Sequence, residues 1–104
     1  MNIDIINRMT TKYYKALKIM YDHKVKKNDG SFFVPMTQVE IADETDVSKI
    51  TMNAIIKGLK ADHLLYSPAG HRGRYYLTDK AIILIEGVEA ILRKMDKEEK
   101  REKE

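Results

Sequence analysis

Cysteine is absent from this chain of 104 residues. Its absence excludes disulfide bonds, catalysis by a thiol and the zinc sites that depend on cysteine. Long apolar runs are missing as well, because the longest one, residues 81–85, is far too short to cross a membrane. The first eleven residues lack the charged start and long apolar stretch of a secretory signal, so we expect a cytoplasmic protein with no membrane partner.

Groups that could carry catalysis or hold a metal are few and scattered. The three histidines are His23, His63 and His71, and their spacing matches no metal site. The few serines lie outside any nucleophile-elbow pattern, and there is no glycine-rich phosphate-binding loop. The neighbouring carboxylates of Asp43 and Glu44 are more simply placed on the exposed side of a helix. We therefore expect no enzyme activity, no metal and no cofactor.

What the chain does contain is typical of one globular domain. Hydrophobic residues make up 43% and charged residues 34%, and the length suffices for a single core. The expected domain covers residues 1–95 and includes N- and C-terminal helices for dimerisation. Residues 96–104 have no apolar side chain, so they are expected to form a charged and frayed tail.

The positive charge is concentrated in the middle of the chain. The net charge is only +3, and residues 96–104 hold five acids and four bases. Between residues 46 and 75, however, five lysines and arginines face two aspartates. Such clustering is typical of a DNA-binding face. A solvated surface without a ligand is the alternative.

The N-terminal third predicts a helix followed by a short strand. Apolar side chains recur at the spacing of one helical face within residues 11–26, at Tyr13, Leu17, Met20 and Tyr21. Residues 28–30, Asn-Asp-Gly, suit a turn. Residues 31–34 then predict a strand, which ends at Pro35 because proline cannot donate a ladder hydrogen bond.

A capping box marks the start of the next helix. Thr37 is followed three residues later by Glu40, so each side chain can bond the backbone amide of the other. The apolar pattern stops at Thr45 and Asp46 after roughly two turns, the length of the positioning helix in a helix-turn-helix. Val47 is then an apolar plug before the next helix.

That next helix has the pattern of a DNA-recognition helix. Ser48 is a preferred N-cap, and one face of the helix is apolar, at Met52, Ile55, Ile56 and Leu59. The other side is basic and polar, and it includes Lys60. The candidate DNA-contacting residues of this helix are Ser48, Lys49, Ile50, Thr51, Asn53 and Lys57.

The first two turns of a recognition helix reach the major groove, and their side chains suit base edges. Asn53 can pair with adenine through two hydrogen bonds, and Lys49 can donate to guanine or to a phosphate. Ile50 or the methyl group of Thr51 can contact a thymine methyl, and Ser48 with the first amides can hold a phosphate. Three alternatives stay open: Ser48 is only a cap, Thr51 faces the core, or Ile50 belongs to a subunit contact.

A glycine-rich hairpin follows, with strands predicted from residue 66 and over residues 74–77. Alternation places Tyr75 and Leu77 inward, and Arg74 and Tyr76 outward. The intervening turn and its edge present His71, Arg72 and Arg74. Arginines on such a wing can follow a phosphate backbone or enter a narrow minor groove. An ordinary surface hairpin with solvated arginines is the alternative.

The C-terminal helix carries a second apolar stripe. Thr78 is a plausible N-cap, and the apolar residues that recur along the helix are Leu84, Val88, Ile91 and Met95. The repeat is too short to establish a coiled coil. We expect this flank to form a homodimer interface, because pairing doubles the DNA site of a single winged helix. The alternative is that the helix folds back onto its own core.

These elements predict a mainly α fold with a small β-hairpin wing, a winged helix-turn-helix of order α-β-α-α-β-β-α. Residues 37–42, residues 47–49 with Met52 and Leu59, and residues 70–78 resemble the small winged-helix regulators of the MarR and ArsR type, and the stretch that contains them covers about forty residues. Without cysteine, a thiol-based sensor of the ArsR type is excluded. The size and layout are also similar to TubR, the centromere-binding adaptors of tubulin-like plasmid and phage partition systems.

These resemblances imply a homodimer that binds double-stranded DNA. The DNA could be an operator, with the protein as a repressor, or a centromere, with the tubulin-like GTPase TubZ as a further partner. In a TubR-like dimer, Ile50 would lie near the twofold axis. A winged helix used only for protein contacts is the alternative function.

Overall fold

The computed structural model describes residues 11–103, with side chains described to residue 101. Its elements in chain order are α2 (Lys12–His23), β1 (Val25–Lys26), β2 (Phe32–Val34), α3 (Gln38–Thr45), α4 (Lys49–Ala61), β3 (Leu65–Tyr66), β4 (Tyr75–Leu77) and α5 (Asp79–Lys103). The predicted order is present with one strand more, β1. The start of the predicted domain, residues 1–10, lies outside the described residues.

The first helix ends three residues before its predicted end. Lys24 is already extended, with φ −62° and ψ 146°, and Val25 and Lys26 pair with Phe33 and Phe32 of β2. The prediction of a helix over residues 11–26 was therefore wrong at its end. The physical reason is tertiary: the Asn-Asp-Gly turn brings this segment back beside β2, where strand pairing outweighs helix propensity.

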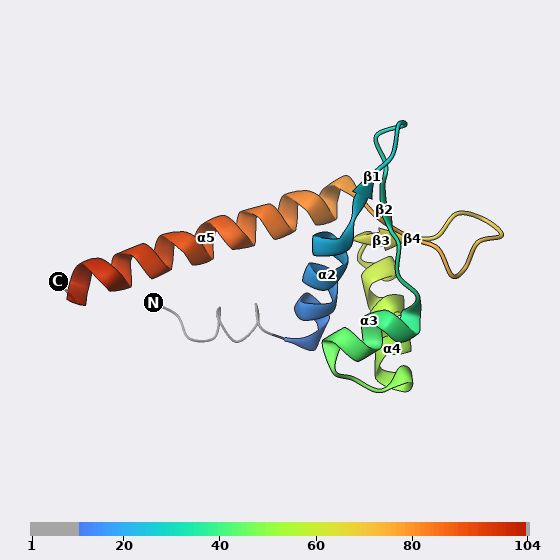
Figure 1. Cartoon of the computed structure of the whole chain (residues 1–104), viewed down its shortest axis with the longest axis horizontal. Coiled ribbons are helices and arrows are strands. Elements are labelled where there is room, and N and C mark those ends of the chain that lie inside the picture. Colours follow the sequence, from blue (N-terminus) through green and yellow to red (C-terminus); the bar gives the residue numbers. More distant parts are fainter. Residues whose placement is uncertain (1–10, 104) are drawn as a thin grey trace.

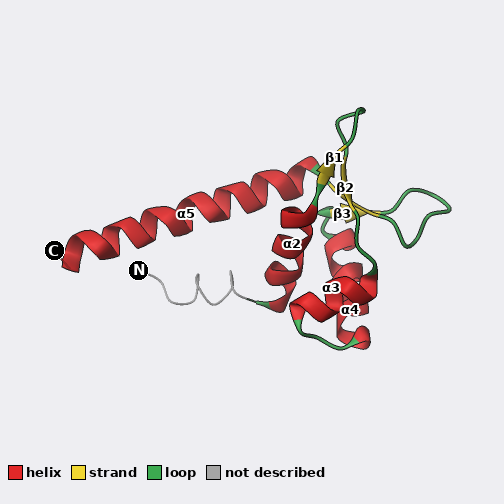
Figure 2. Ribbon diagram, viewed as in Figure 1, coloured by secondary structure: helices red, strands yellow, loops and turns green. Residues whose placement is uncertain are grey.

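Four short strands form one antiparallel sheet in the order β1-β2-β4-β3 (Figure 2). Its inner face meets the helices through Val34, Tyr75 and Leu77, all buried. Its outer face carries an aromatic cluster of Phe33, Tyr66 and Tyr76. Alternation along the strands assigns these two faces.

The outward side chain of Tyr76 is not exposed as predicted. Its exposed fraction is only 7%, because Phe33 and Tyr66 pack against it, each with a ring centroid 5.3 Å away. The sequence pattern indicated which side of the strand Tyr76 occupies. It did not indicate that neighbouring aromatic residues would cover that side.

The core lies between α2, α4 and the inner face of the sheet. The predicted apolar face of α4 is confirmed, since Met52, Ile55, Ile56 and Leu59 are all buried. Leu17 and Met20 of α2 belong to the same cluster. Burial of about six such side chains contributes roughly 1.5 to 3 kcal/mol each before chain entropy is counted. This packing fixes the position of α4 and leaves its opposite side free.

Helix α5 extends well beyond the rest of the fold (Figure 1). The hydroxyl of Thr78 accepts the N–H of Ala81 at 3.1 Å, which confirms the predicted cap. Ala81 and Ile85 are fully buried near its start. The helix continues to Lys103, and the fraying expected from residue 96 stays a prediction. No helix in the described part of the chain is long and apolar enough to span a membrane.

Two ion pairs lie along the last turns of this helix. Lys100 lies 3.3 Å from Asp96, and Arg101 lies 3.8 Å from Glu98. Pairs at these spacings stabilise a helix by a few tenths of a kcal/mol each, and roughly 0.5 kcal/mol at most. Residue 104, the end of the predicted tail, lies outside the described residues.

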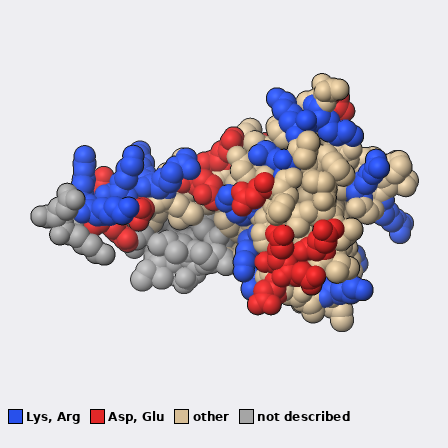
Figure 3. All heavy atoms as spheres, viewed as in Figure 1, with Lys and Arg blue, Asp and Glu red and all other residues tan. Residues whose placement is uncertain are grey.

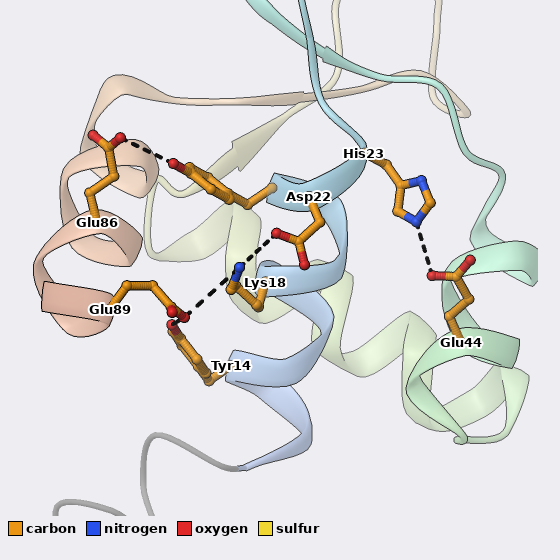
Figure 4. A network of polar contacts seen from close by, with 8 residues as sticks. Tyr14, Lys18, Asp22, His23, Glu44, Glu86 and Glu89 are labelled. Atoms are coloured by element: carbon orange, nitrogen blue, oxygen red, sulfur yellow. Dashed lines mark hydrogen bonds and ion pairs between the residues drawn. The ribbon is translucent and has the colours of Figure 1, made fainter. Parts of the chain in front are cut away.

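Polar contacts join α5 to α2 (Figure 4). The hydroxyl of Tyr14 donates to Glu89 at 3.1 Å, and that of Tyr21 donates to Glu86 at 3.0 Å. Lys18 adds a longer ion pair, 3.9 Å from Glu89. Burial, followed by the bond to Glu89, raises the pKa of Tyr14 well above the usual value for tyrosine. Both tyrosines are thus held in the neutral form that can donate these hydrogen bonds.

Candidate nucleic-acid interface

The two capped helices of the predicted motif are present. Thr37 accepts the N–H of Glu40 at 3.2 Å, and Glu40 accepts the N–H of Thr37 at 3.0 Å, which confirms the capping box. The bond from the backbone of Thr37 lowers the pKa of Glu40. At the start of α4, Ser48 accepts the N–H of Thr51 at 3.1 Å. Each helix therefore begins at a fixed residue.

The turn between these helices sets the angle of α4. Asp46 closes α3 in the left-handed conformation, with φ 61°, and its N–H bonds to the carbonyls of Ala42 and Asp43. This position usually favours glycine, but aspartate tolerates it better than most residues. Val47 follows and packs against the core as predicted, with its N–H 3.1 Å from the Ala42 carbonyl. The turn is thus anchored at both ends.

One side of α4 is open to solvent at the predicted contact residues. The exposed side chains are Ser48, Lys49, Ile50, Thr51, Asn53 and Lys57. Ile50 is 84% exposed, which is unusual for isoleucine in a folded domain. Thr51 does not face the core, and its hydroxyl accepts that of Ser48 at 3.1 Å. Lys60 is half-buried, with Nζ 5.6 Å from the ring centroid of Tyr75.

The wing projects from the sheet on the loop between β3 and β4 (Figure 1). His71, Arg72 and Arg74 are all exposed there. Two successive turns shape the loop, since the N–H of His71 bonds to Pro68 at 2.9 Å and that of Arg74 bonds to His71 at 3.0 Å. The three predicted wing residues therefore lie together on a loop with internal hydrogen bonds.

Acidic residues occupy a separate surface on α3. Glu40, Asp43 and Glu44 are exposed, and Figure 3 shows the resulting red patch over this helix. His23 of α2 reaches the same surface, 3.2 Å from Glu44. The count of charges between residues 46 and 75 did not include these carboxylates. They make the outer surface of α3 unfavourable for a polyanion, so one would approach from the exposed side of α4.

The predicted dimer flank of α5 is only partly available. Leu84 and Ile91 are exposed, at 42% and 54%, whereas Met95 is half-buried. Val88 is only 6% exposed within a single chain, so it has little surface left for a partner. Leu84 and Ile91 lie seven residues apart and therefore share one helical face. Ile83, at 71%, is exposed on another side.

Sequence reasoning missed a group of cations beside the wing. Because residues 24–26 were assigned to a helix, we did not expect Lys26 on a strand that pairs with β2, or Lys27 directly after that strand. A hairpin interpretation of the Asn-Asp-Gly turn, with a strand on each side, could have indicated them. Within residues 11–101, no three histidine or acidic side chains come together as a metal site.

Comparisons with known proteins agree with this geometry at the level of the fold. No family model matches the chain, and no curated protein matches it in sequence. Solved structures of Staphylococcus aureus MepR do match in three dimensions, with a TM-score of 0.64. The chain has a winged helix-turn-helix fold.

Three MepR structures are similar to this chain. They are a mutant form at 24% identity, MepR described as a transcription regulator of the multidrug efflux pump MepA at 22%, and a MepR–DNA complex at 22%. The matches cover 85%, 85% and 89% of this chain. They cover 61%, 61% and 72% of the MepR chains, so this chain spans less than two thirds of the first two. At such identities the likeness establishes the fold alone.

Proposed function

We propose that this chain binds duplex DNA sequence-specifically as a homodimer and regulates transcription. The observation that carries the proposal is the exposed beginning of α4, where Lys49, Ile50 and Asn53 stand free on a helix whose other face is locked into the core. Ile50 is 84% exposed in this part of α4. A major groove accounts for it, because thymine methyl groups offer an apolar contact.

Each side chain of α4 has a distinct role in this proposal. Asn53 pairs with adenine, and Lys49 donates to guanine or to a phosphate. Ile50 contacts a thymine methyl group, and Thr51 adds a methyl group or a hydroxyl to the same region. Ser48 caps the helix, and the first amides of α4 hold a phosphate. Lys57, one turn further along, contacts the backbone.

The wing supplies contacts that do not depend on base sequence. His71, Arg72 and Arg74 lie at or beside a protruding loop and grip phosphates or the minor groove. DNA does not approach from the outer surface of α3, because the acidic side chains there would repel the DNA phosphates. DNA therefore meets α4 and the wing together.

A homodimer follows from the size of the site. One recognition helix contacts only a few base pairs, whereas a twofold dimer contacts two half-sites about one helical turn apart. Leu84 and Ile91 on α5 offer an exposed apolar face for a second copy. This face and α4 belong to the same chain, so the dimer interface would set the distance between the two copies of α4 and hence the half-site spacing.

The structural likenesses favour transcription regulation over partition. One MepR structure holds DNA, and another is described as a transcription regulator. None of the three is a TubR adaptor, so TubZ is not proposed as a partner. Footprinting on DNA beside the gene separates the two roles: one inverted repeat over a promoter is expected, and a row of spaced direct repeats would instead indicate partition.

Salt dependence tests the proposal against a winged helix that contacts only proteins. Labelled duplexes taken from DNA beside the gene are titrated at several salt concentrations. Six phosphate contacts would weaken binding roughly 1,000-fold between about 50 and 200 mM salt. Scrambled duplexes of equal length should bind more weakly than the best natural one. Absent binding, or binding that ignores salt, would reject DNA as the partner.

A further inference from the structure

A row of cations runs from the β1–β2 hairpin to the base of the wing. We call it the basic strip, and it consists of Lys26, Lys27 and Arg74. All three side chains are exposed. Figure 3 shows basic side chains over both the hairpin and the wing. Neither α4 nor the tip of the wing accounts for the two lysines.

Aromatic rings of the sheet hold these cations in place. The Nζ of Lys27 lies 5.8 Å from the ring centroid of Phe33 and donates to the hydroxyl of Tyr76 at 2.9 Å. The guanidinium carbon of Arg74 lies 6.0 Å from the same Phe33 centroid. One ring thus has a hairpin lysine and a wing arginine beside it. The hairpin and the wing therefore contribute to one continuous surface.

Strand pairing fixes this neighbourhood. Phe33 pairs with Tyr76 across β2 and β4, and Val34 pairs with Tyr75. The hairpin and the wing project from the same small sheet (Figure 1). Lys26 lies on the other side of its strand, with Nζ 5.9 Å from the centroid of Phe32. Because β1 is the edge strand of the sheet, the strip bends round this edge, with Lys26 on one face and with Lys27 and Arg74 on the other.

A carboxylate at the tip of the hairpin is turned to a local partner. Asp29 accepts the N–H of Ser31 at 2.9 Å and its hydroxyl at 2.6 Å. These bonds lower the pKa of Asp29. The carboxylate is thus committed to shaping the turn. Its negative charge still acts on Lys27, so the strip carries its three cations beside one carboxylate.

We propose that the basic strip is a second phosphate-binding element, which follows the DNA backbone beyond the bases that α4 contacts. The proposal rests on the proposed function of the chain as a duplex-binding protein. Exposed ammonium and guanidinium groups are suited to phosphates, and the hydrogen bond from Lys27 to Tyr76 restricts one of them before binding. The strip adds affinity without adding base specificity.

Stacking of unpaired bases fits the same surface less well. A stacking platform needs free ring faces. Here Tyr76 is 7% exposed, and Phe33 and Tyr66 already pack against it. The rings therefore serve to position cations, and duplex phosphates are the ligand we infer.

The test compares salt dependence among charge variants of the full chain. The double variant Lys26→Gln/Lys27→Gln should bind the preferred duplex roughly tenfold or more weakly at moderate salt, and its salt slope should fall by about 0.9 for each phosphate that is no longer neutralised. The single variant Lys26→Gln keeps the Lys27–Tyr76 hydrogen bond and should show part of both effects. Preference for the natural over the scrambled duplex should not change.

A matched control removes the same charge elsewhere. Lys94→Gln/Lys97→Gln alters α5, which extends away from the sheet, and should bind like the original chain. If both Lys26 variants also bind and respond to salt like the original, the basic strip is not a phosphate site, although the proposed function stands. If the original chain binds no duplex, the proposed function itself fails. Weakened binding to single strands alone would overturn our choice of ligand.

Discussion

At the scale of single residues, Ile50 departs most plainly from the burial expected of an apolar side chain. Its side chain lies on the solvent-exposed face of α4, so it gains no stabilisation from burial. It lies between the N-cap Ser48 and the polar Asn53. Met52, two residues further, is fully buried and anchors the same turn. The contrast indicates that the first turns of α4 serve two purposes. One face stabilises the fold, and the other is exposed, where we propose that it contacts DNA.

Single substitutions should distinguish side chains that contact bases from side chains that contact phosphates. Asn53→Ala should weaken binding to the preferred duplex by about 1 to 3 kcal/mol and leave binding to scrambled duplex nearly unchanged, because the pairing with adenine is removed. Arg72→Ala should weaken both duplexes alike and reduce the salt slope by about one. Fluorescence anisotropy with both duplexes measures these effects. Equal losses on both duplexes for Asn53→Ala would show that another residue recognises the bases.

Among the elements, α5 depends on polar contacts as well as apolar packing. Ala81 and Ile85 bury its start, but beyond them Tyr14 and Tyr21 of α2 hold it through glutamates (Figure 4). Such bonds require neutral tyrosines. Burial and the nearby glutamates raise the pKa of both hydroxyls. The joint between α2 and α5 is therefore sensitive to strongly alkaline pH.

This joint predicts how stability changes with pH. Because the folded pKa of Tyr14 is raised, its contribution is complete below the unfolded value of about 10 and is lost as pH rises above it. Tyr14→Phe should lower the free energy of unfolding by about 0.5 to 1.5 kcal/mol at neutral pH. The free energy of unfolding of the variant should then decrease less as pH rises above the usual tyrosine pKa. Urea unfolding followed by circular dichroism measures both.

Tyr66→Phe is the control for this experiment, since it also removes a phenolic hydroxyl. Tyr66 lies on the sheet and is 41% exposed. This substitution should cost little stability at neutral pH. If Tyr14→Phe is as stable as the original chain and has the same alkaline profile, the bond to Glu89 does not hold α5.

For the whole molecule, the main consequence of the fold is its elongated shape. The long α5 extends away from the other helices and the sheet. Leu84 and Ile91 are exposed on one side of it, while Val88 is buried within the chain. In a dimer that uses this face, Leu84 and Ile91 would bury the most surface against the partner. Met95 would bury less, and Val88 would bury little because it is already covered. We therefore expect a narrower interface than the sequence stripe suggested.

A charge on this face should prevent dimerisation without unfolding the chain. Leu84→Glu/Ile91→Glu places two carboxylates where we expect the partner to pack. Sedimentation should therefore give a monomer, and circular dichroism should show unchanged helical content. Binding to a full inverted repeat should fall towards that of a half-site, because avidity is lost. Ile83→Glu, roughly 100° round the helix, is the control and should remain dimeric. A double variant that still sediments as a dimer would place the interface elsewhere.

The sequence by itself determined the local elements of this protein. Capping residues at Thr37 and Ser48 and the apolar face of α4 are short-range patterns, so they predicted the motif and its contact residues. Tertiary structure decided what depends on distant neighbours. It paired residues 25–26 with β2, covered Tyr76 with two rings, buried Val88 and placed Lys27 beside Arg74 on Phe33. Helix periods and caps are set within a few residues, whereas strand pairing and burial are settled by segments far apart in the chain.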